Sequence, residues 1–307
     1  MLAGEGETAI LTGVFGVPVW FLATFVALLG LAFGSFLNVC IARLPRHASI
    51  VRPGSRCPKC GMAIRVRDNV PVLSWLVLRG KCRDCGWRIP WRYPAVEVVT
   101  AAFFLLCFLW FGVGLFSFGM MVFCFLLLGL AVMDAETLRL PNAFTWPGIG
   151  LGIVWSGLLM GIARQFPEAF RLLPGLTLGV FSSGPHFSYM RAGVVAALLS
   201  GVWALLAGLG ILLIRWAYLI VRGREGMGLG DAKLLAMIAA WLGPALTVLT
   251  MFLGVMAASV VGLLLVRFSQ RKAAAAQVPF GAFLCGAAIY AIFAGEPLIE
   301  WYLKFFR

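Results

Sequence analysis

The sequence predicts an all-α polytopic membrane protein, with about eight transmembrane helices and a small cytoplasmic zinc-ribbon-like module. The chain has 307 residues, of which 62% are hydrophobic and only 12% are charged, whereas a water-soluble domain carries roughly 25% charged residues. Six stretches contain no acidic, basic or histidine residue, and each reaches the about 20 residues that a helix needs to cross a bilayer core. These stretches cover residues 8–42, 98–133, 143–163, 192–214, 234–266 and 273–295.

Two of the stretches are long enough to contain two helices. The stretch 98–133 has Gly112 and Gly114 near its middle, and 234–266 contains Gly243 followed by Pro244, which is a turn signal. We therefore predict helices at 17–41, 95–111, 116–133, 143–163, 192–214, 231–242, 245–266 and 278–294. The helix at 231–242 is short, and we expect it to be surrounded by protein. The acidic N-terminus lacks the basic segment of a signal peptide, so the first helix is expected to be retained.

The basic residues are distributed unevenly between the two sides of the predicted membrane domain. The net charge is +13, and with eight helices twenty of the 25 Lys and Arg residues fall on one side, many of them in 43–93. This asymmetry follows the positive-inside rule, which makes that side cytoplasmic and both termini external. Orientation and attraction to anionic lipid explain the charge better than a nucleic-acid partner does. The predicted domains are a first transmembrane helix (1–42), a cytoplasmic zinc-binding module (43–93) and a membrane-embedded domain (94–307) with an external loop at 164–191.

Two cysteine pairs lie in the predicted cytoplasmic segment. Each pair has two residues between its cysteines and is followed by a glycine, Gly61 or Gly86. Two such cysteine-containing turns, called knuckles, place four thiolates around one tetrahedral cation, which is the ligand set of structural zinc. A reducing cytoplasm disfavours disulfides, and free thiols or redox chemistry remain the alternatives. Four sulfur ligands leave no position for an activated water, so we expect a structural metal. The candidate ligands are Cys57, Cys60, Cys82 and Cys85.

The remaining cysteines and histidines show no pattern of a site. The single cysteines lie in apolar stretches and are expected to behave as small buried hydrophobes; they are Cys40, Cys107, Cys124 and Cys285. His47 is expected in a surface loop and His186 in the external loop.

Two aspartates stand at the predicted cytoplasmic boundary of the membrane. Asp134 stands at the end of the helix 116–133, and Asp231 opens the helix 231–242 after Gly228 and Gly230. An ionisable group at such a depth is costly, so a functional role is the first hypothesis. Two close carboxyl groups share one proton; the ionised one can deprotonate water while the protonated one hydrogen-bonds to a scissile carbonyl. The alternative is that Asp134 marks a helix end and Asp231 is only an N-cap.

Five motifs in order resemble the prepilin peptidases. They are Gly34-Ser-Phe-Leu-Asn38-Val with Arg43-Leu-Pro45, the two cysteine pairs, Arg92-Tyr-Pro-Ala-Val-Glu97, Asp134 with Leu140-Pro141, and Gly228-Leu-Gly230-Asp231-Ala-Lys233. By motif, the resemblance covers about 34–147 and 222–245, and by order of elements nearly the whole chain.

The resemblance implies an aspartic endopeptidase of the bacterial inner membrane. Such an enzyme cleaves the leader of type IV prepilins or type II secretion pseudopilins at the cytoplasmic boundary, and many members then methylate the new N-terminus with S-adenosylmethionine. Asp134 and Asp231 match the catalytic pair, supported by Gly228, Gly230 and Lys233. The four paired cysteines match the metal ligands. Asn38 and Glu97 are candidate contacts to the methylation cofactor, with hydrogen bonding between helices as the alternative.

This sequence departs from the family pattern in two places, and two other functional classes compete with the protease. The loop 164–191 is longer than usual, and Asn142 stands where an acid often follows Leu-Pro. One competitor is an ion-coupled transporter, which would more often hold its acids near the bilayer midplane and show paired repeats. The other is a zinc-dependent docking protein in which both aspartates are dispensable.

Overall fold

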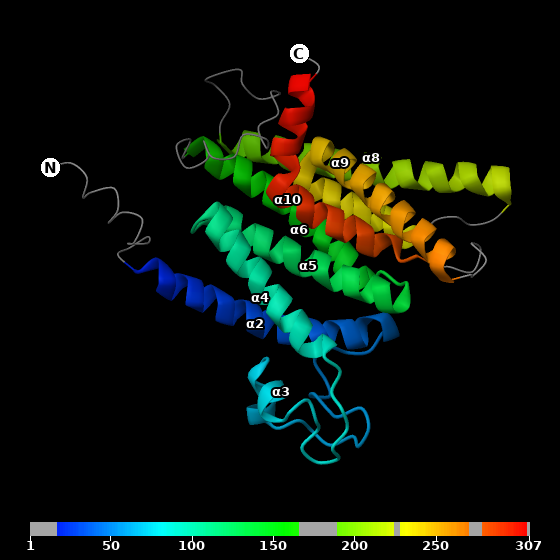
Figure 1. Ribbon diagram of the computed structural model, residues 1–307. Coiled ribbons are helices and arrows are strands. Elements are labelled where there is room, and N and C mark those ends of the chain that lie inside the picture. Colours follow the sequence, from blue (N-terminus) through cyan, green and yellow to red (C-terminus); the bar gives the residue numbers. More distant parts are fainter. Residues whose placement is uncertain (1–16, 166–188, 224–227, 270–277, 306–307) are drawn as a thin grey trace. The chain divides into compact units, whose positions relative to one another are not determined.

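The computed structural model describes residues 17–165, 189–223, 228–269 and 278–305. In these ranges the chain is mainly helical, the predicted module 43–93 consists mostly of turns and loops, and there are two isolated β-bridges and no strand (Figure 1). Seven helices are long and apolar enough to cross a membrane. The main helices are α2 (Val19–Arg43), α3 (Leu73–Val77), α4 (Arg92–Phe111), α5 (Leu115–Thr137), α6 (Asn142–Gln165), α8 (Tyr189–Arg222), α9 (Leu229–Ser269) and α10 (Phe280–Phe305), with short 3₁₀ turns η2 (Leu44–Arg46) and η3 (Val66–Asp68).

The chain divides into two compact units, Met1–Phe125 and Leu126–Arg307. In the first unit α2 packs along α4, and two glycines of α2 make this close approach possible. A Cβ at Gly30 would lie 2.6 Å from the Cα of Ala101, and one at Gly34 would lie 2.6 Å from the Cα of Glu97. Because both obstacles are backbone atoms, no side-chain movement could relieve the clash. Between α2 and α4 the chain forms the cysteine-containing module with α3 (Figure 1).

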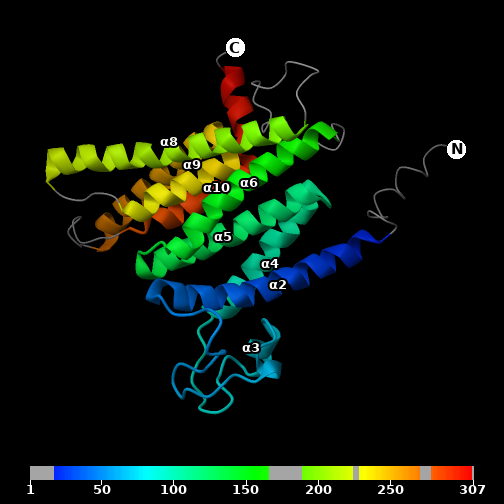
Figure 2. The same cartoon turned by 180° about the vertical axis from the view of Figure 1, so that it is seen from behind.

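In the second unit α6, α8, α9 and α10 lie side by side (Figures 1 and 2). Helix α9 reverses direction at Gly243, whose φ of 72° and ψ of −178° leave the helical path. Its second half returns along α10, since Gly295 meets Leu246 and Gly254 meets Leu284. With α9 counted as two passes, the predicted eight apolar segments are present, and the break at Gly243 is confirmed.

The first half of α9 is the buried centre of the second unit. Every residue from 234 to 242 is at most 9% exposed, so the expectation that this short segment is surrounded by protein is confirmed. At its end, the carbonyl of Ala240 lacks the usual amide donor four residues ahead, because that residue is Pro244. Ser156 of α6 and Ser200 of α8 donate hydroxyl hydrogen bonds to this carbonyl instead, at 3.0 and 2.8 Å.

Three predicted helix ends are wrong by one turn or more. Helix α5 continues past Asp134 to Thr137, α8 continues to Arg222, and α10 continues to Phe305. The charge-free stretches mark where a helix is embedded in apolar surroundings, but helices continue through charged residues once they leave those surroundings. Asp134 therefore lies within the last turn of its helix. The predicted loop 164–191 falls almost wholly outside the described residues, as do His186 and both chain ends.

The single cysteines are buried as predicted, each at most 1% exposed, and His47 is an exposed loop residue.

Candidate functional site

Asp134 is held in place by the beginning of α10. Its side chain is 5% exposed, and its Oδ2 accepts a hydrogen bond of 2.9 Å from the backbone N–H of Ala282. The neighbouring Gly281 favours this contact, since a Cβ there would lie 3.0 Å from the same oxygen and would push it aside. The contribution of α10 to the site was not predicted from the sequence. The available signal was Gly281 in Pro279-Phe280-Gly281, directly before an apolar stretch.

Asp231 lies in the first turn of α9 and is partly buried. Its Oδ2 accepts a hydrogen bond of 3.2 Å from the backbone N–H of Gly228. The donor, Gly228, is the residue before the helix, so Asp231 acts as the third-position acid of a capping box does. An N-cap side chain would instead accept from an amide two or three residues later in the chain. One carboxylate oxygen of Asp231 thus stabilises its own turn, while Oδ1 has no hydrogen bond within the described residues.

The two aspartates meet around Leu140. A Cβ at Gly230, next to Asp231, would lie 3.1 Å from Leu140, and one at Gly281, next to Asp134, would also lie 3.1 Å from it. The two carboxyl groups are close enough to interact electrostatically. No hydrogen bond joins them directly in the part of the chain that the structure describes. The structure therefore brings together the two acids that the sequence singled out, each fixed through one oxygen by a backbone amide.

Lys233 points to α6 and not to the aspartates. Its Nζ donates a hydrogen bond of 2.7 Å to Oδ1 of Asn142 and lies 6.0 Å from the centre of the Trp146 ring. Asn142, the residue that departs from the family pattern, is therefore the partner of the lysine in the glycine–aspartate motif.

The four paired cysteines form one cluster in the module of the first unit. Their sulfurs all lie within 4.8 Å of one another, and the Sγ atoms of Cys57 and Cys85 are 3.8 Å apart. Two thiolates of a tetrahedral site with Zn–S bonds of about 2.3 Å are separated by about 3.8 Å. Gly61 and Gly86 have φ of 72° and 66°, and their amides donate to the carbonyls of Cys57 and Cys82 at 2.9 and 3.0 Å. The predicted knuckles are present.

The thiols of this cluster differ in acidity. Hydrogen bonding, first of all to the backbone of Cys60, lowers the pKa of Cys57 to about 7. For Cys85, a backbone hydrogen bond from Trp87 lowers the pKa, but desolvation and the neighbouring thiols raise it. The net result is a pKa of about 12. A cation is needed to hold all four groups as thiolates at neutral pH, and this donor set fits a divalent metal that prefers sulfur.

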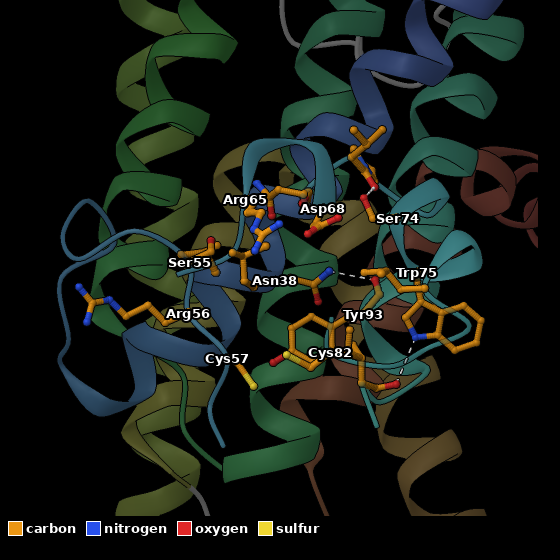
Figure 3. A pocket seen from close by; sticks show the side chains of 18 of the residues that line it. Asn38, Ser55, Arg56, Cys57, Arg65, Asp68, Ser74, Trp75, Cys82 and Tyr93 are labelled. Atoms are coloured by element: carbon orange, nitrogen blue, oxygen red, sulfur yellow. Dashed lines mark hydrogen bonds between the residues drawn. The ribbon is translucent and has the colours of Figure 1, made fainter. Parts of the chain in front are cut away.

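Asn38 and Glu97 lie at the boundary between the helices of the first unit and its module. Asn38 is 4% exposed and donates from Nδ2 to the carbonyl of Tyr93 at 2.9 Å, which links α2 to α4. Glu97 is 8% exposed and its Oε2 accepts a hydrogen bond of 2.7 Å from the backbone N–H of Val72 in the module. Both residues also line a cavity of about 540 Å³, in which Figure 3 shows Asn38 beside Tyr93. The expected interhelical bond is thus present for Asn38, and Glu97 binds the module through Val72 and also interacts with Ser35 of α2.

Comparison with known proteins finds a peptidase family match in each half of the chain. The model of the bacterial peptidase A24 N-terminal domain matches residues 28–111, and that of the type IV leader peptidase family matches residues 120–265. A Pseudomonas aeruginosa protein named prepilin leader peptidase/N-methyltransferase is 32% identical over 91% of this chain and 92% of its own length. A protein of the same name from Aeromonas salmonicida is 30% identical over 97% of this chain and 99% of its own length. Another from Dickeya chrysanthemi is 34% identical over 73% of this chain and 75% of its own length. No solved structure matches the chain.

Proposed function

The chain belongs to the type IV leader peptidase family, and from this premise we propose that it is a bifunctional enzyme of the bacterial inner membrane. It removes the leader peptide of type IV prepilins or type II secretion pseudopilins and then N-methylates the new N-terminal residue. The observation that carries the peptidase assignment is the convergence of Asp134 and Asp231 around Leu140. None of the three relatives is named as a transporter, and no observation favours the ion-coupled alternative.

The proposed cleavage uses the two carboxyl groups as a general acid–base pair. The ionised carboxylate takes a proton from a water molecule, whose oxygen attacks the scissile carbonyl carbon while the protonated carboxyl donates to the carbonyl oxygen. The tetrahedral intermediate then collapses with loss of the C–N bond, and a proton passes to the leaving amine. Each aspartate is fixed through Oδ2 by a backbone amide, and Oδ1 of Asp231 remains available for this work.

The surroundings of the pair suit an extended peptide substrate. Gly228 and Gly230 precede Asp231, and residues without a Cβ let a substrate strand approach the backbone closely. A prepilin has an apolar helix in the bilayer and a leader outside it, so it can reach a boundary site laterally. Lys233 is kept away from the acids by Asn142, and we assign it to supporting the motif.

The predicted orientation and domain division belong to this proposal. The basic side, with the module 43–93 and both aspartates, is cytoplasmic by the positive-inside rule, and both termini and the loop 164–191 are external. The first helix (1–42), the module and the membrane-embedded protease domain (94–307) are the proposed functional parts.

The cysteine module is proposed to hold one structural zinc ion through Cys57, Cys60, Cys82 and Cys85. When bound, S-adenosylmethionine would supply the methyl group for N-methylation, and Asn38 and Glu97 are the proposed contacts to it. The geometry of the sulfur cluster supports the metal, and the names of the relatives support the cofactor.

Cleavage of a purified prepilin by the Asp134→Asn and Asp231→Asn variants tests the peptidase mechanism. A group that transfers a proton in the transition state contributes about 10²–10⁴ in rate, so each variant should lose at least about a hundredfold. Glu136→Gln is the matched control, because this exposed acid lies on the same helix turn as Asp134 and should keep normal activity. If either aspartate variant cleaves at the normal rate, the two-carboxylate mechanism is wrong.

A further inference from the structure

A stretch of nine residues without charge interrupts the basic module of the first unit. It covers residues 70–78, includes α3, and has Ser74 as its only polar side chain. Charged residues stand close to both of its ends, with Asp68 before it and Arg79 directly after it. We call this stretch the apolar run. It is too short to cross a bilayer core, which takes about 20 helical residues.

The apolar run is attached to the membrane helices well inside the ends of those helices. The amide of Val72 donates a hydrogen bond of 2.7 Å to Glu97, which lies about 8 Å along α4 from its first residue, Arg92, at a rise of 1.5 Å per residue. On the neighbouring helix, Gly34 meets the backbone of Glu97 and lies about 14 Å before Arg43, where α2 ends. The attachment point is therefore at least one helix turn inside the ends of both helices.

The cavity beside the apolar run extends along α2 to a similar depth. Its lining on α2 reaches from Ala32 to Arg43, a length of about 16 Å, and all of it except Arg43 belongs to the charge-free stretch 8–42. Residues of the apolar run line the same cavity, among them Trp75 (Figure 3). The run therefore lies along a part of α2 whose composition places it in the membrane.

One face of the apolar run carries large apolar side chains that the described part of the chain leaves exposed. Leu73, Leu76 and Val77 have the spacing of one helix face and are 57%, 58% and 69% exposed. Apolar residues of the membrane helix α2 are exposed to a similar extent, with 70% for Trp20 and 59% for Phe25. In water a cluster of this kind is unfavourable, whereas contact with lipid acyl chains removes it from water.

The backbone of the apolar run meets the condition that lipid imposes, which is a partner within the protein for each polar group. The amides of Ser74, Leu76 and Leu78 donate to carbonyls of the run at 3.0, 3.0 and 2.9 Å, and the hydroxyl of Ser74 donates to another at 2.7 Å. The amide of Val72, which stands before the helix, is bonded to the carboxylate of Glu97. These polar groups therefore need no water, and the run can enter hydrocarbon.

The ends of the apolar run fit the headgroup region of a membrane. Arg67, Arg79 and Lys81 are exposed, and long basic side chains extend from an apolar segment to the interface, where anionic lipid attracts them. The positive φ of 51° at Arg79 and of 65° at Gly80 turns the chain directly after the run. The run can therefore enter and leave the membrane on the same side.

We propose that the apolar run is a re-entrant segment, inserted into the lipid leaflet on the side of the module, with Leu73, Leu76 and Val77 in contact with acyl chains. The partner of this exposed face is the lipid itself. The inference narrows the proposed division of the chain, because one part of the module 43–93 becomes a membrane element. It depends on α2 and α4 spanning the bilayer, and on neither the proposed activity nor the proposed orientation.

Fluorescence quenching in the full-length zinc-loaded protein, reconstituted in nanodiscs of phosphatidylcholine and phosphatidylglycerol, tests the proposal. The fluorescent amino acid Anap replaces either Leu76 or Val77, and the quencher is a lipid with a doxyl group on its acyl chain. The matched control is Anap in place of Val51, a valine of the same module that is 76% exposed and lies outside the run. Quenching at Leu76 and Val77 should be several-fold stronger than at Val51 and similar to that at Phe25 on α2.

A charged substitution gives a second measurement in the same assay. Leu76→Asp should lower the quenching of Anap at Val77 to the level found at Val51, because a charge is costly in hydrocarbon, whereas Val51→Asp should leave it unchanged. The zinc content of each variant shows that its module is folded.

The proposal is wrong if Leu76 and Val77 are quenched no more strongly than Val51, or if Leu76→Asp keeps both its zinc and the full quenching at Val77. If Leu76→Asp loses its zinc, the comparison of Leu76 and Val77 with Val51 decides alone. No prepilin enters either measurement, so the result is independent of the peptidase assignment.

Discussion

The hydrogen bonds to the Ala240 carbonyl should make Ser156 and Ser200 interdependent. Either hydroxyl alone can satisfy this carbonyl, so Ser156→Ala and Ser200→Ala should each cost about 0.6 kcal/mol, the average for hydrogen bonds between membrane helices. In the double variant the carbonyl is left without a donor in a fully buried segment, and an unsatisfied buried acceptor costs about 1–3 kcal/mol. This penalty arises only when both hydroxyls are gone, so the double variant should lose about 1–3 kcal/mol more than the sum of the single variants.

Equilibrium unfolding in mixed micelles with a rising fraction of sodium dodecyl sulfate measures these free energies. The stacked rings of Trp155 and Trp241, 5.9 Å apart, place two fluorescent reporters beside the affected carbonyl. Ser117→Ala is the matched control, because this serine is also buried but its hydroxyl has no partner, so its loss should be neutral or stabilising. Strict additivity of the two serine variants would refute the view that they replace the donor missing at Pro244.

Two further predictions concern the first unit. Cys57→Ser, or removal of zinc by a chelator, should unfold the module, since a structural metal site contributes folding free energy directly. Limited proteolysis should then cut within 43–93. Unchanged protection of this segment from the protease would contradict the zinc assignment. Gly34→Ala should cost about 1–3 kcal/mol because the new Cβ meets backbone at 2.6 Å, whereas Gly210→Ala, where nothing lies within 4 Å, should be neutral or slightly stabilising in the same unfolding assay.

The sequence predicted those parts of the fold that depend on local composition. Charge-free stretches located the membrane helices, Gly112 and Gly243 located the breaks between paired segments, and the spacing of Cys57, Cys60, Cys82 and Cys85 predicted their cluster. The ends of α8 and α10 were wrong because the absence of charge reports the surroundings of a helix and not its length.

The candidate site was predictable only where side chains carry the chemistry. Asp134 and Asp231 could be found because an acid at a membrane boundary is unusual. The contact between Asp134 and Ala282 leaves no direct pattern, since a backbone amide is present at every residue except proline, and the neighbouring Gly281 was an indirect signal. The same holds for Glu97, which was noted as polar but whose bond to the amide of Val72 depends on how the module folds back onto α4.

The amide of Ala282 also sets a limit on how far the peptidase can be shortened. The match to the type IV leader peptidase family ends at residue 265, yet the donor that orients Asp134 lies seventeen positions beyond it. A truncated protein that ends at residue 265 would retain Asp134 and Asp231 but would lose the Ala282 amide that orients Asp134. If Asp134 acts as proposed, α10 is a working part of the catalytic apparatus, and sequence changes at its beginning should alter turnover without touching either aspartate.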